Sequence, residues 1–242
     1  TLEKTDDGSG SVMAEVTVTN TGAGHAVPTG EPMRALLLLV TARCGETELT
    51  PTGGDAVSDV GGALDVRESA EDWSAWPGAA VGDHIRVVRR SGDHHDYVGF
   101  GPFGDGTFSA QDKGLPVERV VGSSTVIGVD GDWVQLDAPL PDGDRAYRTS
   151  SDAWAGHPGF AFARVLVDGE GARMVPHYRA VDVASDNRLL PGASWTSSHS
   201  FDSSSCSVAV VEAKVISRAV PLRQALRHGW TLRDTTLATL SE

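Results

Sequence analysis

The sequence predicts an all-β fold: an immunoglobulin-like β-sandwich with an inserted small β-barrel or meander. The 28 Gly and 12 Pro among 242 residues favour many turns over long helices. Short segments of alternating or β-branched apolar residues follow one another along most of the chain. The longest unbroken apolar run, Ala35–Val40, is too short to span a membrane.

Five segments predict the strands of the host sandwich. Val12–Asn20 alternates apolar and polar residues, which is typical of a half-buried strand. Arg34–Cys44 is almost continuously apolar, so we expect a central strand covered on both faces. Phe160–Asp168 and Arg173–Val183 predict a hairpin across an Asp-Gly-Glu-Gly turn, and Ser207–Ser217 predicts a further strand.

A different rhythm marks residues 79–149, where short strands alternate with Gly-Asp, Asp-Gly and Pro-Asp-Gly turns. The expected strands are Ile85–Val88, Tyr97–Phe100, Val117–Val121, Thr125–Val129, Trp133–Leu136 and Arg145–Arg148. Because sandwich-like strands lie on both sides, we expect residues 79–149 to form an inserted small β-barrel. Residues 1–78 and 150–242 then form the host domain.

Two helices are expected, Leu64–Trp73 and Pro221–His228. The first has a helical composition but weak periodicity. The second begins with Pro and is followed by Gly229, the usual asymmetry of a short helix. The tail from Asp234 onward is expected to add a further helical turn.

Charge and motifs exclude several classes of function. The 20 Lys and Arg against 33 Asp and Glu leave a net charge of −13, which disfavours nucleic acid and anionic membranes as partners. No GxSxG, HExxH, P-loop or CxxCH motif occurs in the sequence. No catalytic residue is therefore predicted.

Histidines keep a metal-dependent enzyme open as an alternative. Asp93-His94-His95-Asp96 contains four possible ligands, but adjacent residues on a strand point to opposite faces. His94 and His95 are therefore weak metal-ligand candidates, and a solvated loop tip is the favoured interpretation. His157 and His177 are further candidates for such an enzyme.

The tryptophans allow a third class, a secreted module that binds carbohydrate or protein. The six Trp residues are spread over the chain, and Trp73 and Trp76 have the spacing of one helix face. A sugar-binding platform would expose several of them, whereas core packing would bury them.

The two cysteines, Cys44 and Cys206, lie too far apart for a CxxC motif. Either two free thiols or one long-range disulfide is compatible with this spacing.

One pair of segments resembles a known family. Asn20–Gly30 has the sequence Asn-Thr-Gly-Ala-Gly-His-Ala-Val-Pro-Thr-Gly, and Asp186–Gly192 has Asp-Asn-Arg-Leu-Leu-Pro-Gly. Together with the strand Val208–Arg218 and the Pro221 that follows, they resemble the non-haem β-domain that closes many multihaem c-type cytochromes. The resemblance covers both ends of the chain and leaves residues 50–150 unmatched.

The resemblance implies a non-catalytic extracytoplasmic domain, periplasmic or at the cell surface, associated with electron transfer. It implies that His25 supplies an axial ligand to a haem or completes a structural network. Because the chain lacks CxxCH, any haem c must be held by a missing segment or by a partner, a multihaem cytochrome segment or subunit.

The same resemblance implies further structural pairs. In an oxidising compartment, Cys44 and Cys206 are expected to form a disulfide. Arg34 enters an apolar strand, so we expect a buried guanidinium that pairs with Asp186, with Arg188 in the same block. Both blocks, and His25 with them, are then expected at one end of the sandwich.

Overall fold

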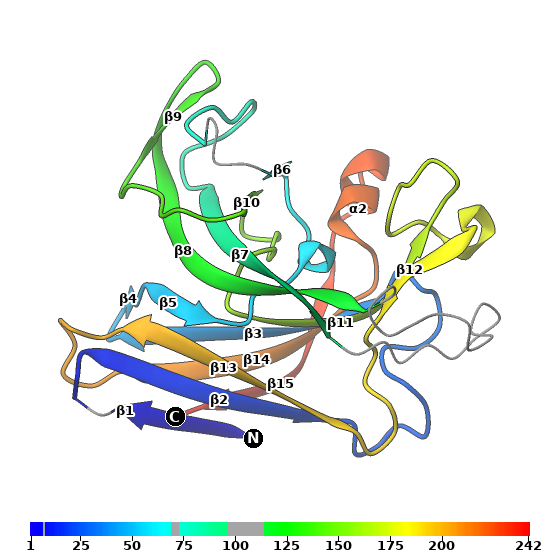
Figure 1. Ribbon diagram of the computed structural model, residues 1–242, viewed down its shortest axis with the longest axis horizontal. Helices are drawn as coiled ribbons and strands as arrows, with labels where there is room; N and C mark the ends of the chain where they lie inside the picture. The colour runs from blue at the N-terminus through cyan, green and yellow to red at the C-terminus, as the bar shows by residue number, and fades with distance from the viewer. Residues whose placement is uncertain (7, 69–72, 96–113) are drawn as a thin grey trace.

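The computed structural model describes residues 1–6, 8–68, 73–95 and 114–242. Two antiparallel sheets of these residues form a sandwich (Figure 1). The first has the order β1 (Leu2–Asp6), β2 (Ser11–Thr19), β13 (Ser194–Asp202), β5 (Pro51–Gly54). The second has the order β12 (Asp182–Asp186), β11 (Gly159–Val167), β3 (Ala35–Cys44), β14 (Val210–Arg218), β15 (Asp234–Ser241), and β4 (Thr47–Glu48) pairs with β3.

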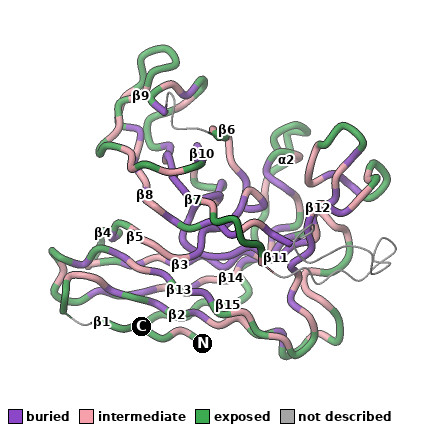
Figure 2. The backbone as a smooth tube through the Cα atoms, viewed as in Figure 1, coloured by how far each residue is buried: buried purple, intermediate pink, exposed green. Residues whose placement is uncertain are grey.

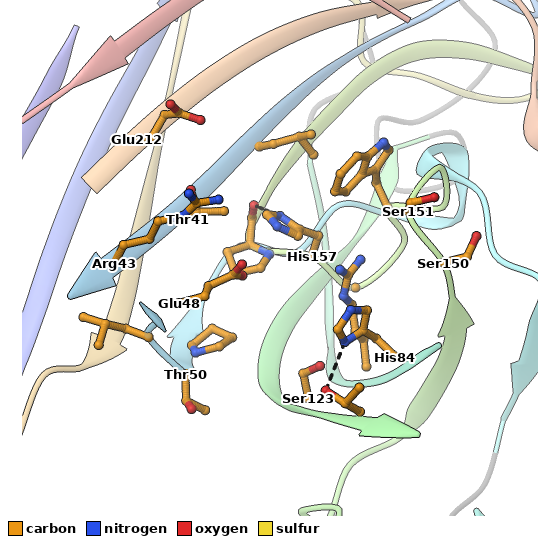
Figure 3. Close-up of a pocket in the computed structure, with 18 of the residues that line it drawn as sticks. Thr41, Arg43, Glu48, Thr50, His84, Ser123, Ser150, Ser151, His157 and Glu212 are labelled. Carbon is orange, nitrogen blue, oxygen red and sulfur yellow. Dashed lines mark hydrogen bonds between the residues drawn. The ribbon is translucent and has the colours of Figure 1, made fainter. Parts of the chain in front are cut away.

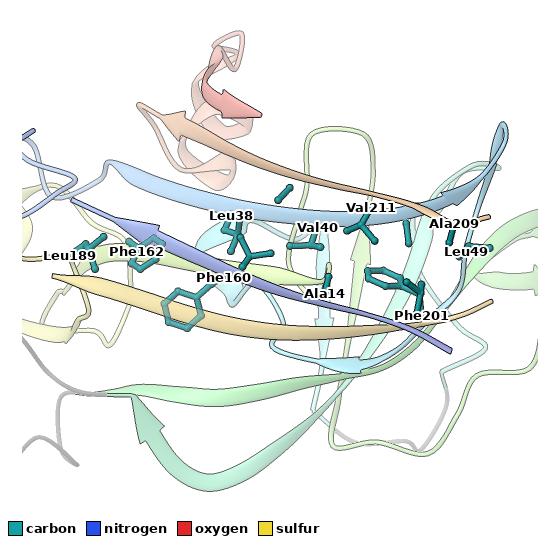
Figure 4. Packing of buried hydrophobic residues seen from close by; sticks show 14 of the residues in the cluster. Ala14, Leu38, Val40, Leu49, Phe160, Phe162, Leu189, Phe201, Ala209 and Val211 are labelled. Carbon is teal, nitrogen blue, oxygen red and sulfur yellow. The ribbon is translucent and has the colours of Figure 1, made fainter. Parts of the chain in front are cut away.

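The sandwich core lies between these two sheets (Figure 4). The apolar residues at alternate positions of β2, Val12, Ala14 and Val16, are buried, as the sequence pattern predicts. Their side chains belong to one cluster with Phe160 and Phe162 of the second sheet. The predicted all-β sandwich is confirmed.

Strand β3 is buried on both faces, as its continuous apolar sequence predicts. Leu38 and Val40 point into the sandwich core, whereas Leu37 and Leu39 belong to a second cluster on the opposite face. The fully buried stretch of β3 is visible as purple tube in Figure 2. A half-buried strand would need polar residues at every second position, and β3 has none before Thr41.

A third antiparallel sheet covers the outer face of the sandwich. Its order is β6 (Asp65–Arg67), β10 (Arg145–Thr149), β7 (His84–His95), β8 (Leu115–Asp130), β9 (Trp133–Leu136). The described part of this sheet does not close into a barrel. Of the two predicted forms, it therefore corresponds to the meander. Strand β6 precedes residue 79, where the insertion is expected to begin, and the division into domains stays a prediction.

The third sheet packs directly on the host strands. Ala56 donates its N–H to the Glu118 carbonyl oxygen at 3.0 Å. Val88, Val120 and Tyr147 of the sheet form a buried cluster with Ala56 and with Ala155. The sheet and the sandwich therefore share a buried interface.

One of the expected helices is present. Helix α2 (Leu222–His228) follows Pro221 and ends at Gly229, whose φ of 64° forms the left-handed cap. Two 3-10 turns, Asp59–Gly61 and His177–Arg179, complete the described helical structure. No helix among the described residues is long and apolar enough to cross a membrane.

The other two helical predictions are wrong. Leu64–Trp73 contains strand β6, which pairs with β10, and residues 69–72 of it lie outside the described residues. The tail from Asp234 is strand β15, paired with β14 along its length. Its three threonines favour an extended backbone, and the open edge of β14 offers hydrogen bonds that an isolated turn lacks.

Three strand predictions also need correction. The Asp-Gly-Glu-Gly turn forms, but Arg173 makes only one bridge with β11, and the returning strand β12 begins at Asp182. The intervening residues adopt the 3-10 turn. Val117–Val121 and Thr125–Val129 are one strand, β8, because Gly122 continues the extended backbone. Tyr97–Phe100 lies outside the described residues.

The disulfide between Cys44 and Cys206 is present. Its sulfurs are 2.13 Å apart and close a loop of 162 residues. Cys44 ends β3, and Cys206 lies in the connection from β13 to β14. The bond therefore fastens the crossover between the two sheets to the end of the central strand.

Candidate functional site

The two segments that carry the family resemblance lie against each other. The Val27 N–H donates to the Leu189 carbonyl oxygen and the Leu189 N–H to that of Val27, both at 2.9 Å. The Asn20 side-chain amide donates to the carbonyl oxygens of His25 (2.9 Å) and Leu189 (3.1 Å). The expectation that both blocks meet at one end of the sandwich is confirmed.

His25 projects from this loop as an exposed side chain. Its Nδ1 lies 3.2 Å from the Ala26 carbonyl oxygen. Because a carbonyl only accepts, we assign the proton to Nδ1, which leaves the lone pair on Nε2. A backbone bond at one ring nitrogen and a free lone pair at the other suit a metal-binding imidazole. The residue therefore fits an axial ligand of haem iron, and that role stays a prediction.

The expected pair of Arg34 and Asp186 is wrong. Arg34 is exposed, and its guanidinium lies over the Gly30 turn. Asp186 is completely buried and pairs with Arg188 at 2.8 Å and with Arg164 at 3.2 Å. The long Arg34 side chain reaches water at the strand entry, whereas Arg188 follows Asp186 closely enough to bond it locally.

The second block is also fastened to β11. The Asn187 side chain accepts from the Ala163 N–H at 3.0 Å and donates to the Ala161 carbonyl oxygen at 2.6 Å. Arg188 binds the Asp186 carboxylate through both Nε and Nη2. Through these bonds, Asp186 and Arg188 are structural residues that position Leu189, which pairs with Val27 of the His25 loop.

The histidine pair on β7 does not form a metal centre with its described neighbours. His94 is exposed, whereas the His95 ring packs edge-on against Phe160 (4.9 Å) and Trp195 (4.8 Å). Within residues 1–6, 8–68, 73–95 and 114–242, no group of three or more His, Cys, Asp or Glu could hold a metal ion. His177 pairs with Glu31, and His157 lines the cavity described next.

A polar cavity of about 500 Å³ lies where the third sheet meets the sandwich (Figure 3). Strands β7 and β8 form one side, β3 and β14 another, and residues 150–158 close it. Its polar lining residues are Thr41, Arg43, Glu48, Thr50, His84, Arg86, Ser123, Thr125, Asp137, Ser150, Ser151, His157, Glu212 and Lys214.

The interior of the cavity is lined by two neutral imidazoles, of His84 and His157, and by the cationic side chain of Arg86. Burial, together with the charge of Arg86, lowers the pKa of His84 and holds that of His157 well below the ordinary value. The Nδ1 of His157 lies 2.7 Å from the Pro158 carbonyl oxygen, so it carries the proton. Burial lowers the pKa of Arg86 to about 10, so its guanidinium remains charged at neutral pH.

Sequence reasoning named His157 but missed Arg86 and His84. The cavity residues come from seven separate stretches of the chain, and no motif spacing joins them. The tryptophans gave no signal either, because Trp73 and Trp76 are buried in a core cluster on the face of the third sheet that is turned away from the sandwich. Of the six, Trp154 lines this cavity.

Fold, disulfide and site together define a disulfide-bonded all-β sandwich domain with an exposed histidine loop and a polar cavity. No protein-family model and no curated protein matches the sequence. Among solved structures, a penta-haem cytochrome c552 from Thermochromatium tepidum is similar, with a TM-score of 0.43 and 14% identity. The match covers 100% of this chain and 38% of the cytochrome chain, so this chain spans well under half of that length.

Proposed function

We propose that this chain is a non-catalytic extracytoplasmic interaction domain of an electron-transfer protein, and that it docks a haem-bearing segment or subunit through the His25 loop. The observation that carries the proposal is the mutual pairing of Val27 and Leu189. It joins the two segments that resemble the β-domain of multihaem cytochromes. The pairing holds the loop in place while His25 stays accessible.

Two further features support this proposal. The Cys44–Cys206 disulfide is typical of proteins outside the reducing cytoplasm. The Nδ1–H of His25 donates to a backbone carbonyl, which leaves Nε2 as the atom that would bind iron. The haem itself would supply the redox chemistry, and this chain would supply the ligand and the docking surface.

A haem c peptide with one open axial position tests the proposal. Titration with the full chain is expected to convert the high-spin absorption spectrum to a low-spin spectrum. His25→Ala is expected to lose this change, whereas the control His228→Ala, which removes another exposed imidazole, is expected to keep it. Equal spectra from His25→Ala and the unmodified chain would contradict the proposal, as would no low-spin species at millimolar protein.

A further inference from the structure

Arg86 differs from the other buried arginines of the described chain. Three of the four pair with carboxylates: Arg145 with Glu68 and Glu118, Arg148 with Asp83, and Arg218 with Asp234. Arg86 is only 8% exposed, and its hydrogen bond is a single contact from Nη1 to the Ala153 carbonyl oxygen at 3.2 Å. No carboxylate of the described residues lies within ion-pair distance of it.

A guanidinium has five N–H donors, and one backbone acceptor leaves most of them without a partner. Arg86 lines the cavity, and its other guanidinium nitrogens are not among the enclosed atoms that lack a partner. They are therefore open to the cavity. A buried charge without an ion-pair partner is costly, so an anion bound directly to Arg86 in this cavity would satisfy both the donors and the charge.

Several features of the cavity define the class of that anion. Hydroxyl groups of Ser123, Thr125, Ser150 and Ser151 can donate to or accept from ligand hydroxyls. His84 and His157 are neutral and offer further hydrogen bonds, and Trp154 gives an apolar wall. A volume of about 500 Å³ is in the usual range for a small-molecule site.

The charge distribution favours a singly charged ligand. Arg86 is the cation buried in the interior. The less buried part of the lining carries three carboxylates, Glu48, Asp137 and Glu212, against two cations, Arg43 and Lys214, and is therefore net negative. The chain as a whole carries a net charge of −13. A dianion such as phosphate would meet this repulsion with only one deep cation to balance it, whereas one carboxylate matches the fork of a guanidinium.

We propose that the cavity binds a small hydroxylated monocarboxylate of the sugar-acid class, with its carboxylate on the guanidinium of Arg86 and its hydroxyls on the serine and threonine side chains. This site is separate from the His25 loop, and its occupation does not depend on haem. It makes the chain a ligand-binding domain as well as a docking domain.

Calorimetric titration of the full chain with D-glucuronate, D-glucose and inorganic phosphate tests the class. Glucuronate is expected to bind at least tenfold more tightly than glucose, which has the same ring but no carboxylate. It is also expected to bind more tightly than phosphate. Three results would each overturn the proposal: equal binding of glucose and glucuronate, tighter binding of phosphate, or no heat from glucuronate at 50 mM, which is about fiftyfold above a Kd of about 1 mM.

Three variants test the residue. Arg86→Gln is expected to remove the preference for glucuronate over glucose, whereas Arg86→Lys keeps part of it. Arg179→Gln, a partly exposed arginine that pairs with Asp168 outside the cavity, is the matched control and is expected to bind as the unmodified chain does. A preference unchanged in folded Arg86→Gln would refute the assignment.

Glu48→Gln keeps the proposal testable if Arg86→Gln does not fold. Glu48 is exposed, and its charge acts on Arg86, so its removal reduces repulsion of a bound carboxylate without exposing a core. Glucuronate is then expected to bind severalfold more tightly and glucose unchanged. An equal effect on both sugars, or a weaker affinity for glucuronate, would contradict an anion beside Arg86.

Discussion

Replacing Asp186 by Asn tests the interpretation of the second motif block as a structural anchor. The carboxylate is completely buried, accepts hydrogen bonds from Nε and Nη2 of Arg188 at 2.8 Å, and forms an ion pair with Arg164, whose Nε lies 3.2 Å away. The two arginine side chains are only 15% and 13% exposed. Asn keeps the shape but removes the charge, which leaves two poorly solvated guanidinium groups without their counter-charge.

Removing one partner from a buried ion pair costs about 3–5 kcal/mol, and we expect Asp186→Asn to lower the free energy of unfolding by that amount. Urea denaturation followed by tryptophan fluorescence measures it. Arg34→Ala is the control, because its exposed side chain predicts a change within about 0.5 kcal/mol. A loss below about 1 kcal/mol for Asp186→Asn, or an equal loss for Arg34→Ala, would refute this reasoning.

Three further perturbations follow from buried features. Replacing both Cys44 and Cys206 by Ala opens a loop of 162 residues and is expected to cost about 5 kcal/mol in urea denaturation; an unchanged midpoint would contradict it. Burial lowers the pKa of His199 from 6.5 to about 3, so between these values the unfolded chain binds a proton that the folded chain does not. The free energy of unfolding is therefore expected to decrease as the pH is lowered below about 6.5, by up to about 1.4 kcal/mol per pH unit. His199→Gln should make this dependence on pH shallower across pH 4–7. Gly159 has a φ of 148°, and a Cβ added there would overlap a backbone oxygen of β3. Gly159→Ala is therefore expected to lower the free energy of unfolding by more than about 4 kcal/mol. The control Gly169→Ala, which has open space around it, should melt within a few degrees of the unmodified chain.

The parts of the fold that were predictable are those whose hydrophobic pattern is local. The alternation in β2, the continuous apolar run of β3 and the Pro and Gly at the ends of α2 each specify one element. The failures depend on distant pairing. Strand β15 is fully exposed and carries no apolar stripe, so its state is decided by the free edge of β14.

The histidine loop was predictable and the Arg34 pair was not, for a related reason. Asn20, Gly24, His25 and Pro28 lie close together in sequence, so their loop is a local feature. The partner of a buried carboxylate is set by which guanidinium the backbone brings near it. Asp186 pairs with Arg188, two residues away in sequence, and with Arg164, which lies opposite it on the neighbouring strand β11.

Arg86 shows what a sequence signal for the cavity would have been. It lies between Ile85 and Val87 on β7, and both of these pack into the core cluster on the face of the third sheet that is turned away from the sandwich. Strand alternation therefore turns Arg86 towards the sandwich, the side on which Val88 is buried. A cationic residue inside a strand that is covered on both faces predicts a buried charge. Whether that charge has a carboxylate partner depends on the segment that packs against this face of the strand. Here that segment is the one around Gly156, where an added Cβ would lie 2.8 Å from the Arg86 Cβ. Because glycine permits this approach, the segment supplies a backbone carbonyl instead of a carboxylate, and the charge stays available to a ligand.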